Sequence, residues 1–375
     1  MFAVGLDLHM KEILDSGLCA TGQPVFWLPL SFGSKATMKT TLEHWKNRQW
    51  PTPLLYVNDE PGGTGPKAER ALAQLKEIRS WGIPVKTTTA GLDPRTGVLG
   101  QFYDVWVISD RGIHYENYMN AQRLGCELWQ YNSNTPHENM PFVRAFYGFC
   151  PFRTGIKGVA FWAYYDARKW FADSQGNAEG NPGSWRLSLV CPSPSGPIPT
   201  LAWEAIREGV DDYRYCQLFQ SLLDGAEKQT ERLSAEVDTL LSKEDRDQLK
   251  RREDEDTGPH DPAKPRVAWR PADAKQAKGE EMFLEWRALD HQLRRAEAVR
   301  MFVIESIPFD IGVARLGAKT LHATRSGKYC PPLALTDVGE DPFTITETKR
   351  RIVTSSIIRL HDALQRSEQI EASRN

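Results

Sequence analysis

The chain has 375 residues, of which 26% are charged and 40% hydrophobic, and its formal net charge at pH 7 is −2. This composition is ordinary for a globular protein with a large core, built as one large domain with additions or as two domains. The balanced charge argues against a nucleic-acid binder, and no apolar run approaches the roughly 20 residues of a membrane span. We therefore expect neither a nucleic-acid partner nor a membrane partner.

Cysteine and histidine spacing gives no support for a metal site. The six cysteines include no C-x-x-C pair and the eight histidines include no H-E-x-x-H motif, so we expect core thiols, no metal and no cofactor. The first residues also lack the basic region and following apolar run of a signal peptide. The sequence thus predicts a cytoplasmic protein, unless its native start lies further upstream.

Short apolar runs alternate with helical patterns along the first half of the chain. Residues 4–17 have a helical pattern, and residues 67–82 repeat small and apolar side chains at helical spacing before Gly82, a typical helix stop. Strands bounded by turn residues are predicted at 25–30, 53–58, 84–90, 103–109, 126–132 and 157–165. Strands that alternate with helices over short connections predict a parallel sheet covered by helices.

Among parallel architectures, the positions of the polar residues favour a (β/α)8 TIM barrel. Barrel enzymes build their sites at the carboxyl ends of the strands. Here the predicted strand ends carry the side chains of Asp59, Glu60, Asp110, Tyr131, Asn132, Trp162 and Tyr164. Only six strands precede the helix that begins near Leu201, so we expect a barrel that lacks its first one or two β/α units.

The second half of the chain is predominantly helical in pattern. Trp203, Ile206, Val210, Tyr213 and Leu218 suggest an apolar stripe on a closing helix of the barrel. Dense mixed charge follows, which is typical of solvated helix or linker. We therefore expect a barrel domain over 1–225, a charged helical or linker region over 226–300, and an extension over 301–375 that ends in a helix.

The stretch "PLLYVNDEPGG" at 53–63 ends an apolar strand in two adjacent carboxylates, Asp59 and Glu60. Adjacent residues on a regular strand point to opposite faces, so they fit poorly as the two carboxylates of an ordinary glycosidase, which lie about 5 to 9.5 Å apart. They suit a substrate-assisted mechanism better. Asp59 would orient a 2-acetamido group that attacks the anomeric carbon, Glu60 would protonate the leaving oxygen, and Tyr131 would bind the acetamido oxygen.

A structural alternative is open for the same pair. Carboxylates are favourable at helix N-termini, and Asp59 and Glu60 precede the helix predicted after Pro61 to Pro66. On this interpretation the two side chains cap that helix and have no chemical role.

Further motifs occur in a fixed order: "YVNDEP", "LWQYNSN", Arg144 before "GIKGVAFWAYYDARKW", and "PTLAWEAIREGVDDYRY". Over residues 25–222 the chain resembles the catalytic domain of glycoside hydrolase family 123, which overlaps the domain of unknown function 4091. Its most specific parts are "DEP" after a strand, Gly158 with Trp162, and "REGVDDY". The chain departs from the family at Ala202, where an arginine is common, and upstream, where further barrel strands and a β-sandwich domain are expected.

The resemblance implies a β/α barrel and retaining, substrate-assisted hydrolysis of β-N-acetylgalactosaminides. It gives Asp59 the amide-orienting role and Glu60 the acid/base role. A carbohydrate substrate is the expected partner, bound by Trp129, Tyr131, Asn132, Asp110 and Trp162. Two other hypotheses stay open: a non-catalytic carbohydrate-binding remnant of a barrel, and a two-carboxylate glycosidase that pairs Glu60 with Asp110. The sequence does not predict an oligomeric state.

Overall fold

The computed structural model describes residues 7, 10–11, 14–15, 25–27, 34–62, 64–90, 99–109, 115–132, 140–161, 189–191, 193–257, 270–304 and 346–374. The chain divides into two compact units. The described residues up to Arg207 belong to the first unit, and those from Glu208 onward belong to the second.

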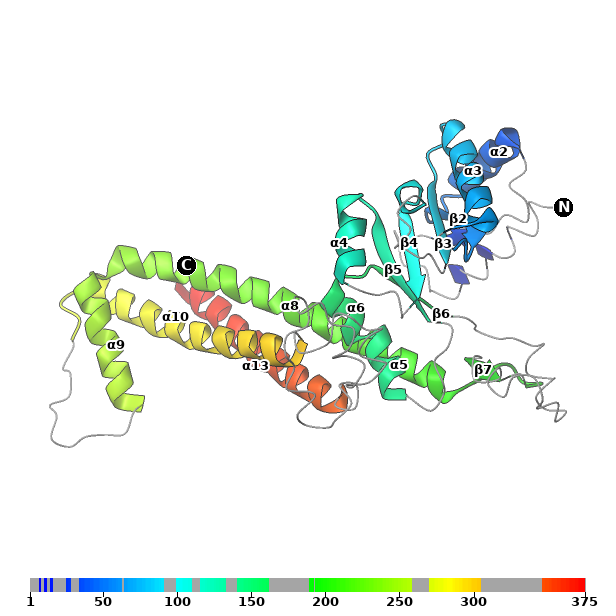
Figure 1. The fold of residues 1–375 in the computed structure, drawn as a ribbon. Helices are drawn as coiled ribbons and strands as arrows, with labels where there is room; N and C mark the ends of the chain where they lie inside the picture. The colour runs from blue at the N-terminus through cyan, green and yellow to red at the C-terminus, as the bar shows by residue number, and fades with distance from the viewer. Residues whose placement is uncertain are drawn as a thin grey trace. The chain divides into compact units, whose positions relative to one another are not determined.

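The first unit is built on a sheet of six parallel strands (Figure 1). Their order across the sheet is their order in the chain, so every crossover moves the chain one strand further in the same direction. This arrangement confirms the six predicted strands and their parallel pairing, and the curled sheet is consistent with part of an α/β barrel. The strands are β1 (Val25–Trp27), β2 (Pro53–Asp59), β3 (Lys86–Ala90), β4 (Val105–Ser109), β5 (Glu127–Asn132) and β6 (Gly158–Phe161).

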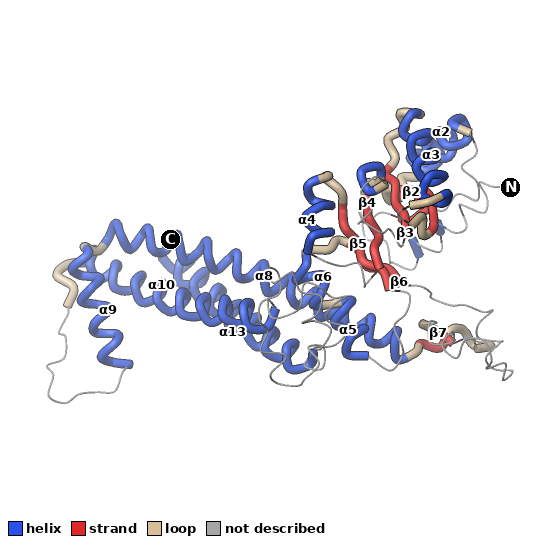
Figure 2. Tube along the Cα trace, viewed as in Figure 1, coloured by secondary structure: helices blue, strands red, loops and turns tan. Residues whose placement is uncertain are grey.

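Helices connect these strands, as Figure 2 shows in blue against the red sheet. As predicted, the helix after β2 buries Ala68, Ala71, Leu75 and Ile78 and stops before Gly82, whose φ of 64° is in the left-handed region that favours glycine. The helices of this unit are α2 (Lys35–Asn47), α3 (Pro66–Ser80), η2 (Gly100–Phe102), α4 (Tyr115–Arg123), α5 (Met140–Tyr147) and α6 (Phe149–Thr154). The short strands β7 (Val190–Cys191) and β8 (Ile198–Pro199) form a separate antiparallel pair.

The sheet is most deeply buried at its central strands, where Leu54 and Leu55 on β2 and Val107 and Ile108 on β4 are at most 1% exposed, whereas the edge strand β6 is half-buried to exposed. One face packs against helices, with α3 on β2 and α4 on β5. The opposite face, called the inner face below, carries a cluster of Leu54, Val105, Val107 and Trp129, with Tyr131 and Ala160 packed against it. The inner face therefore includes two of the predicted substrate-binding residues.

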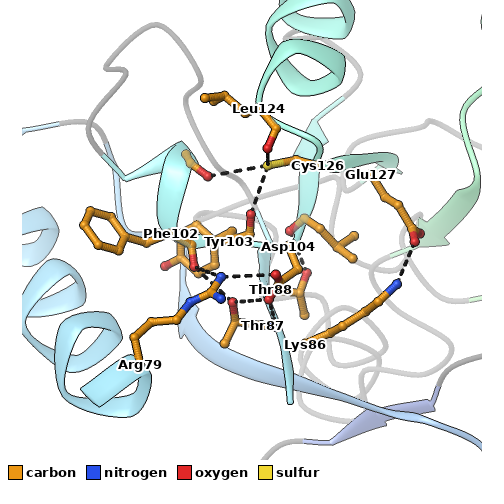
Figure 3. Close-up of polar contacts among 12 residues, drawn as sticks. Arg79, Lys86, Thr87, Thr88, Phe102, Tyr103, Asp104, Leu124, Cys126 and Glu127 are labelled. Carbon is orange, nitrogen blue, oxygen red and sulfur yellow. Dashed lines mark hydrogen bonds and ion pairs between the residues drawn. The ribbon is translucent and has the colours of Figure 1, made fainter. Parts of the chain in front are cut away.

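A polar network joins the strands at their N-terminal ends (Figure 3). The Asp104 carboxylate accepts hydrogen bonds from the Thr87 backbone N–H at 2.7 Å, the Thr87 hydroxyl at 3.0 Å and Arg79 at 3.1 Å. Lys86 on β3 pairs with Glu127 on β5 at 2.9 Å. These contacts fix the starts of β3, β4 and β5, at the opposite end of the sheet from Asp59 and Glu60.

The second unit is helical. It contains α8 (Leu201–Leu240) from Glu208 onward, α9 (Lys243–Thr257), α10 (Ala274–Val299), the π-helical turn η5 (Arg300–Ile304) and α13 (Thr346–Arg374). Helices α8, α10 and α13 run alongside one another (Figure 1), and α9 is tied to α10 by the ion pairs Arg252–Glu280 and Arg287–Glu253. In the region predicted as solvated helix or linker, the four charged side chains of these pairs thus lie in contacts between helices.

The apolar stripe predicted for the helix after Leu201 was wrong. Val210 and Leu218 are 37% and 49% exposed, and Trp203, Ile206 and Tyr213 are only half-buried. The buried residues of α8 recur at alternating steps of three and four, the spacing of a helix that packs lengthwise against others. They are Ala202, Ala205, Gly209, Asp212, Cys216, Phe219, Leu223, Ala226, Thr230, Leu233 and Val237.

Candidate functional site

The carboxyl end of β2 contains a register shift. Tyr56 pairs with Thr88 of β3, whereas Asn58 pairs with the very next residue, Thr89. Val57 is therefore an extra residue relative to β3, as in a β-bulge. Bulges reverse the alternation of side chains beyond them, because one residue of one strand has no counterpart on the other.

The shift moves Asp59 to the inner face. Asn58 points to the helix-covered face, where its amide donates to Gln74 of α3 at 2.5 Å and its oxygen accepts from the Tyr103 hydroxyl at 3.1 Å. Asp59 points to the same side as Tyr56, whose hydroxyl donates to Asp59 Oδ1 at 2.6 Å. Asp59 is exposed, and among the described residues its second carboxylate oxygen has no hydrogen-bond donor.

Glu60 follows directly, in an unusual backbone conformation. Its φ is 43°, in the left-handed region, which costs a residue with a side chain about 1 to 2 kcal/mol. The side chain is exposed and forms no ion pair or hydrogen bond with any residue that the structure describes. Backbone strain of this kind clusters at functional sites, so the conformation makes Glu60 a candidate functional residue.

The capping alternative is not supported. Helix α3 begins at Pro66, its N-cap is Gly65, and no side chain provides a capping hydrogen bond there. Within the described part of the chain, neither Asp59 nor Glu60 bonds to a backbone N–H of α3. The two carboxylates therefore do not stabilise this helix by capping.

Trp129 and Tyr131 lie on the inner face, on β5. The Trp129 indole N–H donates to Glu127 at 3.3 Å, and its ring lies against the backbone of Gly158 on β6. A Cβ on Gly158 would lie 2.1 Å from the Trp129 ring, so glycine at this position makes room for the indole. This contact is a physical reason for a glycine that the sequence analysis singled out only by resemblance.

Tyr131 and Asp59 share the inner face but do not adjoin. Strands β3 and β4 separate β2 from β5. With a spacing of about 4.8 Å per strand, β2 and β5 lie roughly 14 Å apart along the sheet, and the straight-line distance between them is shorter because the sheet is curled. Tyr131 is half-buried and Trp129 is 9% exposed. On the strands from β2 to β5 the inner face carries the apolar cluster of Leu54, Val105, Val107 and Trp129.

Three predicted site residues are not tested by this geometry. Asp110 and Trp162 lie outside the described residues, and for Asn132 the structure describes the backbone at the end of β5 but not the side chain. Tyr56 was not among the predicted site residues. On a regular strand, residues three apart point to opposite faces, so only the register shift at Val57 brings Tyr56 to Asp59.

Within the described part of the chain, no three His, Cys, Asp or Glu side chains gather as metal ligands would. A membrane-crossing helix is likewise absent from the described residues, since none combines the necessary length with the necessary apolarity.

No protein-family model matches the chain, and no curated protein sequence matches it. The resemblance to glycoside hydrolase family 123 therefore depends on the motifs alone and stays a prediction.

Proposed function

We propose that this chain contributes the catalytic part of a glycoside hydrolase that cleaves 2-acetamido β-glycosides, of the N-acetylgalactosamine type, on a TIM-barrel scaffold. The observation that carries the proposal is the end of β2. There the register shift puts Asp59 on the inner face, where the Tyr56 hydroxyl donates to it, and Glu60 follows in a left-handed conformation without a partner among the described residues.

Asp59 is the amide-orienting group. Tyr56 occupies Oδ1, which leaves the other oxygen to accept the acetamido N–H of the substrate. The amide becomes positively charged when its carbonyl oxygen attacks the anomeric carbon, and a carboxylate beside it stabilises that charge. Fixing the carboxylate before the substrate binds removes part of the cost of orientation.

Glu60 is the acid and then the base. As the bond from the anomeric carbon to the leaving oxygen breaks, Glu60 gives its proton to that oxygen, and an oxazolinium intermediate forms. Glu60 then removes a proton from the water that opens the intermediate, and the sugar is released with its anomeric configuration retained. In this proposal Tyr131 binds the far side of the sugar through a hydrogen bond rather than the acetamido oxygen, because three strand spacings separate β5 from β2. Trp129, which is 9% exposed and packed against Gly158, supports Tyr131 from within the core.

The test is Glu60→Gln, assayed with aryl N-acetyl-β-galactosaminides whose leaving groups differ in acidity. We expect kcat/KM, which reports the steps up to cleavage of the glycosidic bond, to fall by about 10² to 10⁴ with a weakly acidic phenol and far less with a dinitrophenol, which needs no proton. Glu69→Gln is the matched control, since Glu69 is an exposed glutamate in the first turn of α3 and should be replaceable without loss.

Two results would contradict the proposal. An equal loss with every leaving group would remove Glu60 from the proton transfer. A chain that binds these sugars but never hydrolyses them, in a preparation shown to be folded, would favour a carbohydrate-binding protein instead.

A further inference from the structure

A hollow lies in the first unit, at the opposite end of the sheet from Asp59. It has a volume of ≈ 460 Å³, within the range of small-molecule sites. Helix α2, the segment between α2 and β2, and the turn after α3 surround it. Its described lining residues are Lys39, Leu42, Glu43, Trp45, Lys46, Trp50, Thr52, Pro53, Gly82, Ile83 and Pro84.

Two tryptophans form a rigid wall of this hollow. Trp45 is 3% exposed, and its indole N–H donates to the Pro51 carbonyl at 2.5 Å. Trp50 contacts Trp45 edge-to-face, with ring centroids 5.3 Å apart, and contacts His44 in the same manner at 5.4 Å. Two neighbours hold the half-buried Trp50 in place. The protein would therefore lose little conformational entropy when a flat ligand stacks on this ring.

The charged residues of the hollow lie along one stripe of α2. Lys39, Glu43 and Lys46 follow one another at steps of four and three, so they lie on the same side of the helix. Both lysines are exposed, and neither forms an ion pair with a residue that the structure describes. The stripe therefore has a net charge of +1 beside an otherwise mainly apolar hollow.

We propose that this hollow binds a flat, apolar ligand that carries a carboxylate, of the aromatic acid class. The ring would lie against Trp50 and the residues Ile83 and Pro84, and the carboxylate would face Lys39 and Lys46. A neutral sugar fits less well, because apart from Thr52 the polar side chains of the described lining are charged ones on the α2 stripe. This inference is independent of the proposed glycosidase.

Indole-3-acetate is a suitable probe, with indole-3-ethanol as its neutral analogue. We expect the ¹⁵N–H signal of the Trp50 indole, assigned with Trp50→Phe, to shift with millimolar indole-3-acetate, and the alcohol to bind more weakly. Replacing both lysines (Lys39→Gln with Lys46→Gln) should lower the affinity for the acid by about fivefold and leave the affinity for the alcohol unchanged. Leu42→Trp, which fills the hollow from a half-buried position on α2, should abolish binding of both.

Lys76→Gln is the matched control, because Lys76 is an exposed lysine on α3 outside the hollow. It should bind both compounds as the unaltered chain does. The proposal is wrong if several millimolar indole-3-acetate leaves the Trp50 signal unmoved, if acid and alcohol bind equally, or if a folded Leu42→Trp variant still binds. The helix content and melting temperature of each variant establish that it is folded.

Discussion

The Tyr56 hydroxyl donates a hydrogen bond of 2.6 Å to Asp59 Oδ1, although the two residues are three positions apart on one strand. The register shift between Tyr56 and Asn58 makes this contact possible. In the proposed mechanism the bond fixes the carboxylate that holds the acetamide, so Tyr56 acts as a positioning residue rather than a catalytic one.

Tyr56→Phe removes this bond and keeps the ring. A hydrogen bond to a charged group at a partly exposed site is worth about 1.5 kcal/mol, so kcat/KM for an aryl N-acetyl-β-galactosaminide should fall about tenfold. Affinity for a thiazoline analogue of the oxazolinium intermediate should fall in parallel, while affinity for galactose, which has no acetamido group, should not change. Tyr118→Phe, a comparable loss of a surface hydroxyl on α4, should be neutral. If the affinities for galactose and for the thiazoline fall equally, Tyr56 has a merely structural role.

Glu60→Gly should separate stability from activity. Glycine adopts a φ near 43° without strain, so the free energy of unfolding of the variant should be about 0.5 to 1 kcal/mol higher. The variant should nevertheless lose hydrolysis, because it lacks the carboxylate. Gln49 is the matched control, because it has a φ of 53° just beyond α2 and no proposed role. Gln49→Gly should stabilise similarly and keep activity. Urea unfolding followed by tryptophan fluorescence measures both variants, and a destabilised Glu60→Gly would show that the glutamate has a structural contact.

Arg350 on α13 should be critical for the second unit. It bonds to the fully buried Asp212 and to Glu208, both at 2.5 Å, and these acidic residues belong to the "REGVDDY" motif on α8. Arg350→Ala removes the guanidinium beside a buried carboxylate, so we expect a loss of about 3 to 5 kcal/mol. Its control is Arg214→Ala, since Arg214 pairs with Asp211 at the surface of α8 and should cost less than about 1 kcal/mol. Thermal unfolding monitored at 222 nm compares the two variants, and equal effects would contradict the assigned importance of the buried pair.

The ion pairs of Arg350 with Asp212 and Glu208 explain why the buried face of α8 could not be found from the sequence. A prediction from periodicity considers apolar side chains only, and it selected Val210 and Leu218, which are exposed. The buried face instead contains Gly209, Asp212 and small residues, and Asp212 is buried because its partner arrives 138 residues later in the chain. Local pattern has no information about such a partner.

The sequence by itself determined the six strands of the main sheet and the helix α3 that follows the second of them. Six strands, their parallel pairing and the buried face of α3 follow from hydrophobic spacing and from Gly82, because these depend on neighbouring residues and on short connections. Only the tertiary structure decided the site. Which face Asp59 occupies depends on one extra residue, Val57, relative to the adjacent strand, and the space for Trp129 depends on Gly158 in the next one. Both are set by how strands align with each other, and no single strand encodes its own register.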